Sequence, residues 1–206
     1  MYHEISRYQA LNALSATGGV VIFGGSEDKT IPLCELKQAF DLRENFYDRS
    51  VTALTLTDAP DIFDRCIAPL APDTLLVHLG EADLETFEKA PNTFDRAYRH
   101  LLQHIQESCK KLQIGVISLR ERPSDPRIKG MNGHLRMIAE SEHCPYFDLS
   151  TMQLWDPQQT RDVISFLYST GFVRPIGQKR PLYDLVKILF YDGPRACRDG
   201  APLADV

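Results

Sequence analysis

The sequence lacks the features of several large protein classes. It has no basic excess, because 28 acidic residues outnumber 23 lysines and arginines and give a net charge of −5. A nucleic-acid-binding protein would need a basic surface to neutralise phosphates. No apolar run approaches the roughly 20 residues that a membrane-spanning helix requires. We therefore expect neither a nucleic-acid partner nor a membrane partner.

Neither disulfides nor secretion is indicated. The five cysteines are scattered and never spaced as Cys-x-x-Cys, which is typical of reduced thiols. Residues 1–16 mix charged and apolar side chains and lack the basic start and apolar core of a signal peptide. His100 and His104 lie four residues apart, but opposite the apolar stripe of their expected helix, so we expect no metal site. These observations predict a cytoplasmic protein.

Short apolar runs alternate with amphipathic segments, which predicts a parallel α/β sheet. Alternation of this kind implies right-handed crossovers with helices on both faces of the sheet. We expect a single three-layer α/β/α domain over residues 1–193 and a polar tail at 194–206. Five strands are expected at 20–23, 51–56, 75–79, 114–119 and 146–149. The main helices are expected at 3–15, 32–43, 94–112, 131–142, 158–168 and 178–191.

Acidic residues follow three of the expected strands. In open α/β sheets, ligands bind beyond the carboxyl ends of the strands, so these side chains could converge at the rim of a pocket. They would then bind a cation, an amine or sugar hydroxyls. The alternative is that they cap helix N-termini, where the helix dipole favours negative charge. The residues are Asp28, Asp58, Glu81 and Asp83.

Common cofactor motifs are missing. The segment after the first expected strand, residues 23–30, contains Lys-Thr but not the glycine spacing of a phosphate-binding loop. It also lacks the dinucleotide fingerprint, and the chain has no Gly-x-Ser-x-Gly elbow. We expect no cofactor.

Three altered motifs, in serial order over residues 19–190, resemble those of the SGNH (GDSL-type) hydrolase family. The Gly-Asp-Ser of that family, which holds its nucleophile, corresponds to Gly24-Gly25-Ser26. Its Asn-x-Gly-x-x-Gly-x-Thr corresponds to residues 48–55, and its Gly-x-Asn-Asp to residues 80–83. The resemblance implies a flavodoxin-like five-stranded parallel sheet. It also implies a nucleophile position at Ser26 and an oxyanion pocket at Ala53, Gly80 and Ala82.

The departures from the family bear on activity. The Asp-x-x-His-Pro that supplies its base corresponds to residues 169–175, and no histidine follows His143. Ser26 therefore lacks its expected base, and a serine hydroxyl is a weak nucleophile without one. Ala82 cannot replace an asparagine amide as an oxyanion donor, a loss of about 2.7–4 kcal/mol in transition-state stabilisation. Arg174 stands near the vacated histidine position, where it could hold a carboxylate or a phosphate.

Three functions remain open at this point. We favour a protein that binds a small polar or acylated ligand and is impaired as an esterase, with Ser26 in contact with ligand or capping a helix. The second is a working ester or O-acetyl hydrolase with a relocated base, for which His78, His134 and His143 are candidates. The third is an interaction protein with an apolar patch on its N-terminal helix and a stable homodimer. The fold alone cannot choose among them.

Overall fold

A computed structural model describes residues 2–39 and 42–148, with Ser150, Leu182, Val186, Leu189 and Phe190. The chain divides into two compact units. The first contains Met1–Lys29 and Asn45–Thr151 and carries the whole sheet. The second includes Thr30–Glu44 and the helix α2 (Leu33–Ala39). The predicted boundary between residues 193 and 194 lies outside the described residues.

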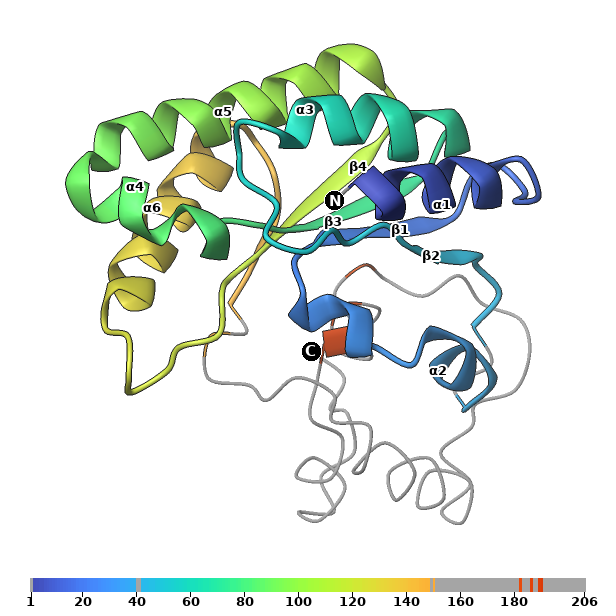
Figure 1. Ribbon diagram of the computed structural model, residues 1–206, viewed down its shortest axis with the longest axis horizontal. Coiled ribbons are helices and arrows are strands. Elements are labelled where there is room, and N and C mark those ends of the chain that lie inside the picture. The colour runs from blue at the N-terminus through green and yellow to red at the C-terminus, as the bar shows by residue number, and fades with distance from the viewer. Residues whose placement is uncertain are drawn as a thin grey trace. The chain divides into compact units, whose positions relative to one another are not determined.

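Five parallel strands form one sheet in the order β2-β1-β3-β4-β5, which confirms the predicted fold class (Figure 1). This is the flavodoxin-like order, and its direction reverses between β1 and β3, where ligands bind in such sheets. The strands are β1 (Val20–Gly24), β2 (Phe46–Asp48), β3 (Thr74–His78), β4 (Gln113–Ile117) and β5 (Tyr146–Phe147).

The second strand lies earlier than the sequence predicted. We expected it at residues 51–56, but β2 ends at Asp48 and residues 51–56 form a loop. Val51 still donates a backbone hydrogen bond to the carbonyl of Gly24. Ala53, with φ of 53°, then turns the chain out of the sheet, because a left-handed residue cannot continue a strand.

The helices of the first unit bury one face of the sheet. They are α1 (Tyr2–Asn12), α3 (Ala59–Ile62), α4 (Leu84–Lys89), α5 (Pro91–Ser108) and α6 (Arg127–Ser141). Figure 1 shows α1, α3 and α5 over this face, whose core includes Val21, Phe23, Leu75 and Val77. Ile22 and Leu76, which point to the opposite face, are also fully buried.

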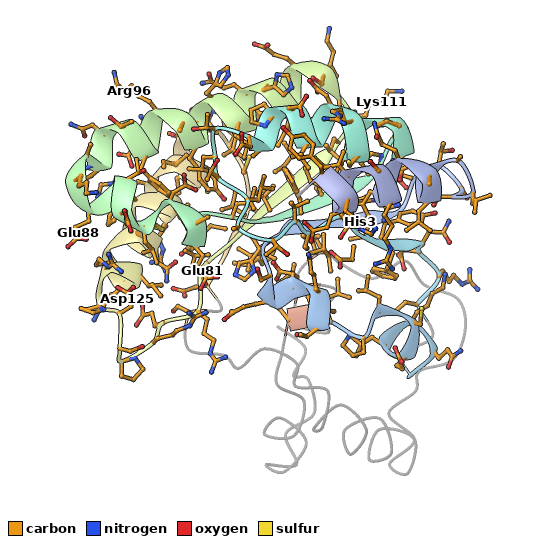
Figure 2. All side chains as sticks on the ribbon, in the orientation of Figure 1. His3, Glu81, Glu88, Arg96, Lys111 and Asp125 are labelled. Carbon is orange, nitrogen blue, oxygen red and sulfur yellow. The ribbon has the colours of Figure 1, made fainter. Side chains whose placement is uncertain are left out.

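The long helix α5 confirms the strongest sequence pattern. Five residues of the predicted stripe are fully buried, whereas charged residues such as Arg96 point outward (Figure 2); the five are Phe94, Tyr98, Leu101, Leu102 and Ile105. The helix ends at Ser108, so the last two residues of that stripe, Cys109 and Leu112, lie beyond it and are half-buried. Both α5 and α6 begin a few residues earlier than predicted. None of the helices in the described ranges is long and apolar enough to cross a bilayer.

The C-terminal predictions are only partly covered by the structure. The expected helix at 158–168 and the tail at 194–206 lie outside the described residues. Within the expected helix at 178–191, four residues are described, and all four are helical. Val186 and Leu189, two of the predicted face, are fully buried.

Candidate functional site

A pocket of about 350 Å³ lies at the carboxyl ends of β1, β3 and β4. Its size falls in the range of small-molecule sites, and its place is the switch point of the sheet. Segments from four parts of the chain line it, among them the loop that follows β2. Six predicted site residues are in this lining: Ser26, Asp28, Ala53, Gly80, Glu81 and Ala82.

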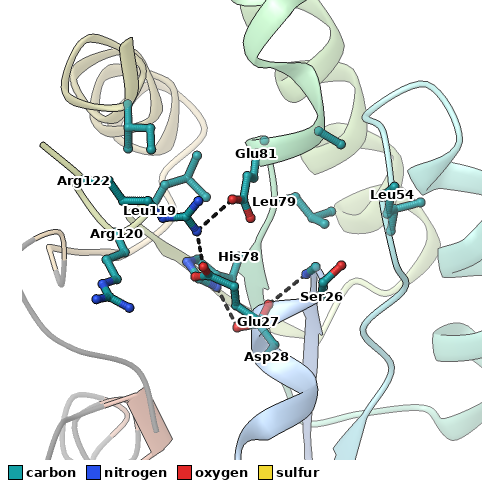
Figure 3. Close-up of a pocket in the computed structure, with 15 residues that line it drawn as sticks. Ser26, Glu27, Asp28, Leu54, His78, Leu79, Glu81, Leu119, Arg120 and Arg122 are labelled. Carbon is teal, nitrogen blue, oxygen red and sulfur yellow. Dashed lines mark hydrogen bonds and ion pairs between the residues drawn. The ribbon is translucent and has the colours of Figure 1, made fainter. Parts of the chain in front are cut away.

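A buried Asp–His pair forms part of this pocket. Asp28 accepts a hydrogen bond from the backbone N–H of Gly25 at 2.8 Å, and its other carboxylate oxygen lies 2.7 Å from His78 Nδ1 (Figure 3). The exposed fractions of Asp28 and His78 are 1% and 7%. Burial alone would lower the pKa of His78, but the adjacent Asp28 carboxylate outweighs it and raises that pKa above its ordinary value.

Gly24 makes room for this pair. It is the last residue of β1 and lies beside His78 in the sheet register. A methyl group on Gly24 would overlap the Asp28 carboxylate oxygen that accepts from Gly25. The absence of a side chain at Gly24 therefore lets Asp28 fold back over the strand end.

We expect Gly24→Ala to destabilise the protein by about 1–3 kcal/mol, because the added methyl group must displace the Asp28 carboxylate. Urea denaturation followed by circular dichroism measures the change. Gly133→Ala is the matched control, since nothing lies within 4 Å of a methyl group added there in α6. The control should be neutral or stabilising by up to about 1 kcal/mol. Equal losses in both variants would contradict the proposed overlap.

The Ser26 hydroxyl is not paired with the histidine. Within the described part of the chain, no hydrogen bond joins Ser26 to a histidine, a lysine or a carboxylate. His134 Nδ1 lies 2.8 Å from the carboxylate of Asp95, and His143, just after α6, has a left-handed backbone. Neither histidine lines the pocket. No sequence pattern indicated that His78 pairs with Asp28, because the two residues are 50 positions apart. The one available signal was a histidine at the end of an otherwise apolar strand.

A charged bridge crosses the rim of the pocket. Arg122, from the loop after β4, pairs with Glu27 and lies 2.8 Å from the carboxylate of Glu81 (Figure 3). The carboxylate predicted at the rim, Glu81, therefore shares one arginine with Glu27. The sequence placed Arg122 in a charged loop but did not indicate these partners.

Two backbone positions in the pocket lining have positive φ angles. Ala53, at the second glycine position of its motif, has φ of 53°, and Gly80 has φ of 126°. Left-handed backbone costs a non-glycine residue about 1–2 kcal/mol, so Ala53 keeps a glycine-like conformation against its intrinsic preference. Asp83 stabilises the loop that contains Ala53, because its buried carboxylate accepts a hydrogen bond from the backbone N–H of Leu56 at 3.1 Å.

The structure corrects the expected position of two acidic residues. Asp83 faces the loop at Leu56, and Asp58 accepts a hydrogen bond from the Thr55 hydroxyl at 2.8 Å. Neither residue lines the pocket, and neither side chain caps its neighbouring helix by a hydrogen bond. The reason is that two residues of the loop after β2, Thr55 and Leu56, donate hydrogen bonds to these carboxylates. Arg174 lies outside the described residues.

Asp83→Asn should flatten the pH dependence of stability. Burial, together with the charge of Asp58, raises the pKa of Asp83 to about 6 although the Leu56 N–H opposes this. A carboxyl group with a raised folded-state pKa binds its proton more tightly when folded, so stability falls as pH rises from about 4 to about 6. Asparagine keeps an acceptor for Leu56 without the charge.

The wild type should therefore lose on the order of 2–3 kcal/mol more than Asp83→Asn between pH 4 and pH 7. Urea denaturation at a series of pH values gives this difference. Asp61→Asn, at an exposed carboxyl group that does not act on Asp83, serves as the control and should follow the wild type. Parallel curves for the wild type and Asp83→Asn would contradict the prediction.

Comparison with known proteins identifies the fold that carries this pocket. No family and no curated protein matches the sequence. Solved structures do match. A putative platelet activating factor from Streptococcus pneumonia has a TM-score of 0.61 at 16% identity, over 76% of this chain and 78% of that one. A GDSL-like lipase from Bacteroides thetaiotaomicron has a TM-score of 0.59 at 16% identity, over 96% and 98%. The lipase/acylhydrolase from Enterococcus faecalis has 0.54 at 13%, over 79% and 100%.

The chain has the SGNH-hydrolase fold. In this SGNH-type fold Ser26 directly follows β1, and the altered Gly-x-Asn-Asp directly follows β3, as the resemblance implied. The histidine motif of the SGNH family corresponds to residues 169–175 of this chain, which lie outside the described residues. At these identities the neighbours show the fold alone.

Proposed function

We propose that this protein binds a small polar or acylated ligand in the pocket around Ser26 and is impaired as an ester hydrolase. The observation that carries the proposal is the lack of a base hydrogen-bonded to the Ser26 hydroxyl among the described residues. His78 Nδ1 lies 2.7 Å from Asp28, while among the described residues the Ser26 hydroxyl has no base as a hydrogen-bond partner. Ester hydrolysis by serine needs a base that takes the hydroxyl proton during attack.

Two sequence features support impairment. No histidine follows His143, so the segment at 169–175 cannot supply the base found there in the family. Ala82 lines the pocket at the position of the asparagine of the family and has no amide to donate to an oxyanion. The pocket is still shaped to bind a small ligand, because backbone segments from the ends of several strands line one cavity.

Covalent labelling tests this proposal. A fluorophosphonate probe reacts with serines that an adjacent base activates. We expect intact-mass spectrometry to show no adduct on the wild type beyond that on Ser26→Ala after an hour of incubation. An adduct of one probe per chain that Ser26→Ala removes would overturn the proposal.

A working hydrolase with a relocated base is the second candidate. It is favoured by one observation, that the Asp28–His78 pair lines the same pocket as Ser26. The aspartate lies against Nδ1, the orientation in which such a pair would direct Nε2 at a nucleophile. In this case both Ser26→Ala and His78→Gln should abolish labelling, whereas Asp64→Asn at the exposed His104 pair should leave it unchanged.

A further inference from the structure

Among the residues that the structure describes, one basic group in the pocket makes no direct contact with a carboxylate. Its charged lining consists of three carboxylates and three basic groups, which are Glu27, Asp28, Glu81, His78, Arg120 and Arg122. Arg122 pairs with Glu27 and Glu81, and His78 pairs with Asp28. Each carboxylate in the lining thus contacts His78 or Arg122, whereas Arg120 contacts none of them.

Arg120 is the first residue of the charged loop after β4, and it is half-buried. In the part of the chain that the structure describes, its guanidinium has neither an ion pair nor a hydrogen bond. A guanidinium is always charged at neutral pH and presents a planar set of donors that matches a carboxylate or a phosphate in bidentate geometry. Partial removal from water strengthens such a contact.

We propose that Arg120 binds an anionic group, a carboxylate or a phosphate, of the ligand that occupies this pocket. The inference rests on the proposed function, because it requires that the pocket bind a small ligand. Figure 3 places Ser26 on one side of the view and Arg120 and Arg122 on the other, with His78 between them. The ligand thus carries its acyl or polar end toward Ser26 and its anionic end toward Arg120.

A series of matched probes tests this inference. N-acetylglycine, N-acetyl-4-aminobutyrate and N-acetyl-6-aminohexanoate carry an acyl group and a carboxylate at increasing separation, and each has a neutral primary amide for comparison. Isothermal titration calorimetry with the full chain measures their affinities. We expect at least one acid to bind tenfold or more tightly than its amide, and that preference to fall below twofold in Arg120→Gln.

Two variants separate the local contact from net charge. Arg120→Lys keeps the charge and should retain a reduced preference for the acid. Arg96→Gln makes the same change in net charge on the exposed side of α5 and should bind like the wild type. Thermal melting of each variant checks that it is folded. Competition by inorganic phosphate at lower concentration than acetate would identify phosphate as the preferred anion.

The outcomes distinguish this inference from the proposed function. Equal affinity for acid and amide would overturn the role of Arg120 while leaving a small-ligand pocket in place. An acid preference that Arg120→Gln retains would also overturn it. Failure of every acid and amide to bind at 20 mM would overturn both the inference and the ligand-binding function.

Discussion

Replacing Asp28 with alanine is expected to destabilise the protein by about 3–5 kcal/mol, the cost of removing one partner of a buried charged pair. The Asp28 side chain is 1% exposed and accepts from both the Gly25 N–H and His78 Nδ1. Its removal takes away the acceptor of the Gly25 N–H and the partner of His78 Nδ1, and the loss of a hydrogen bond at a buried polar group is costly. Urea denaturation at pH 7 measures the loss.

A second His–Asp pair in the same chain gives the control. His104 lies 2.9 Å from Asp64, but the two side chains are 28% and 51% exposed. Asp64→Ala should therefore cost at most about 1 kcal/mol, as exposed ion pairs do. Asp28→Asn keeps one acceptor and should fall between the two if Asp28→Ala does not fold. Equal effects of Asp28→Ala and Asp64→Ala would contradict the structural role of the buried pair.

The sheet could be predicted because most of its strands are continuous apolar runs. Val20–Phe23 and Leu75–Val77 are buried on both faces, and such runs between helical segments indicate parallel strands. The strand β2 was not predicted, because it has the opposite character. Its three residues, Phe46–Asp48, are only half-buried, whereas the Val-Thr-Leu pattern that followed resembled a strand more closely.

The pocket could be placed from sequence, but its chemistry could not. Serial order along the chain located Ser26 after β1 and Gly80 after β3, and parallel topology brings such ends together. The pairing of Asp28 with His78, and of Arg122 with two glutamates, depends on side-chain directions across separate loops. No spacing rule along the sequence encodes these partners.

The conformation of Ala53 shows that a backbone hydrogen-bond donor and a proton-accepting side chain depend on different features of the chain. Ala53 has a left-handed backbone at a position where the resemblance has glycine, the residue that adopts this conformation most readily. A hydrogen-bond acceptor in the pocket could still meet a backbone N–H there. Proton transfer is different, because it depends on one side chain that reaches the Ser26 hydroxyl.

Ester hydrolysis that depends on Ser26 is therefore expected to be lost. Removing the base from a serine hydrolase typically lowers the rate by at least about 10⁴-fold, and the missing asparagine donor adds a further factor of about 10²–10³. Activated esters also react slowly with water and with surface groups, so the informative quantity is the difference between the wild type and Ser26→Ala.

The most direct test is the steady-state hydrolysis of p-nitrophenyl acetate and butyrate at pH 7.5 by the wild type, Ser26→Ala and His78→Gln. We predict that the three rates agree within about twofold, because none of the residues that the structure describes offers the Ser26 hydroxyl a hydrogen-bonded proton acceptor. A wild-type rate a hundredfold or more above both variants would contradict this, and would show that the imidazole held by Asp28 serves Ser26.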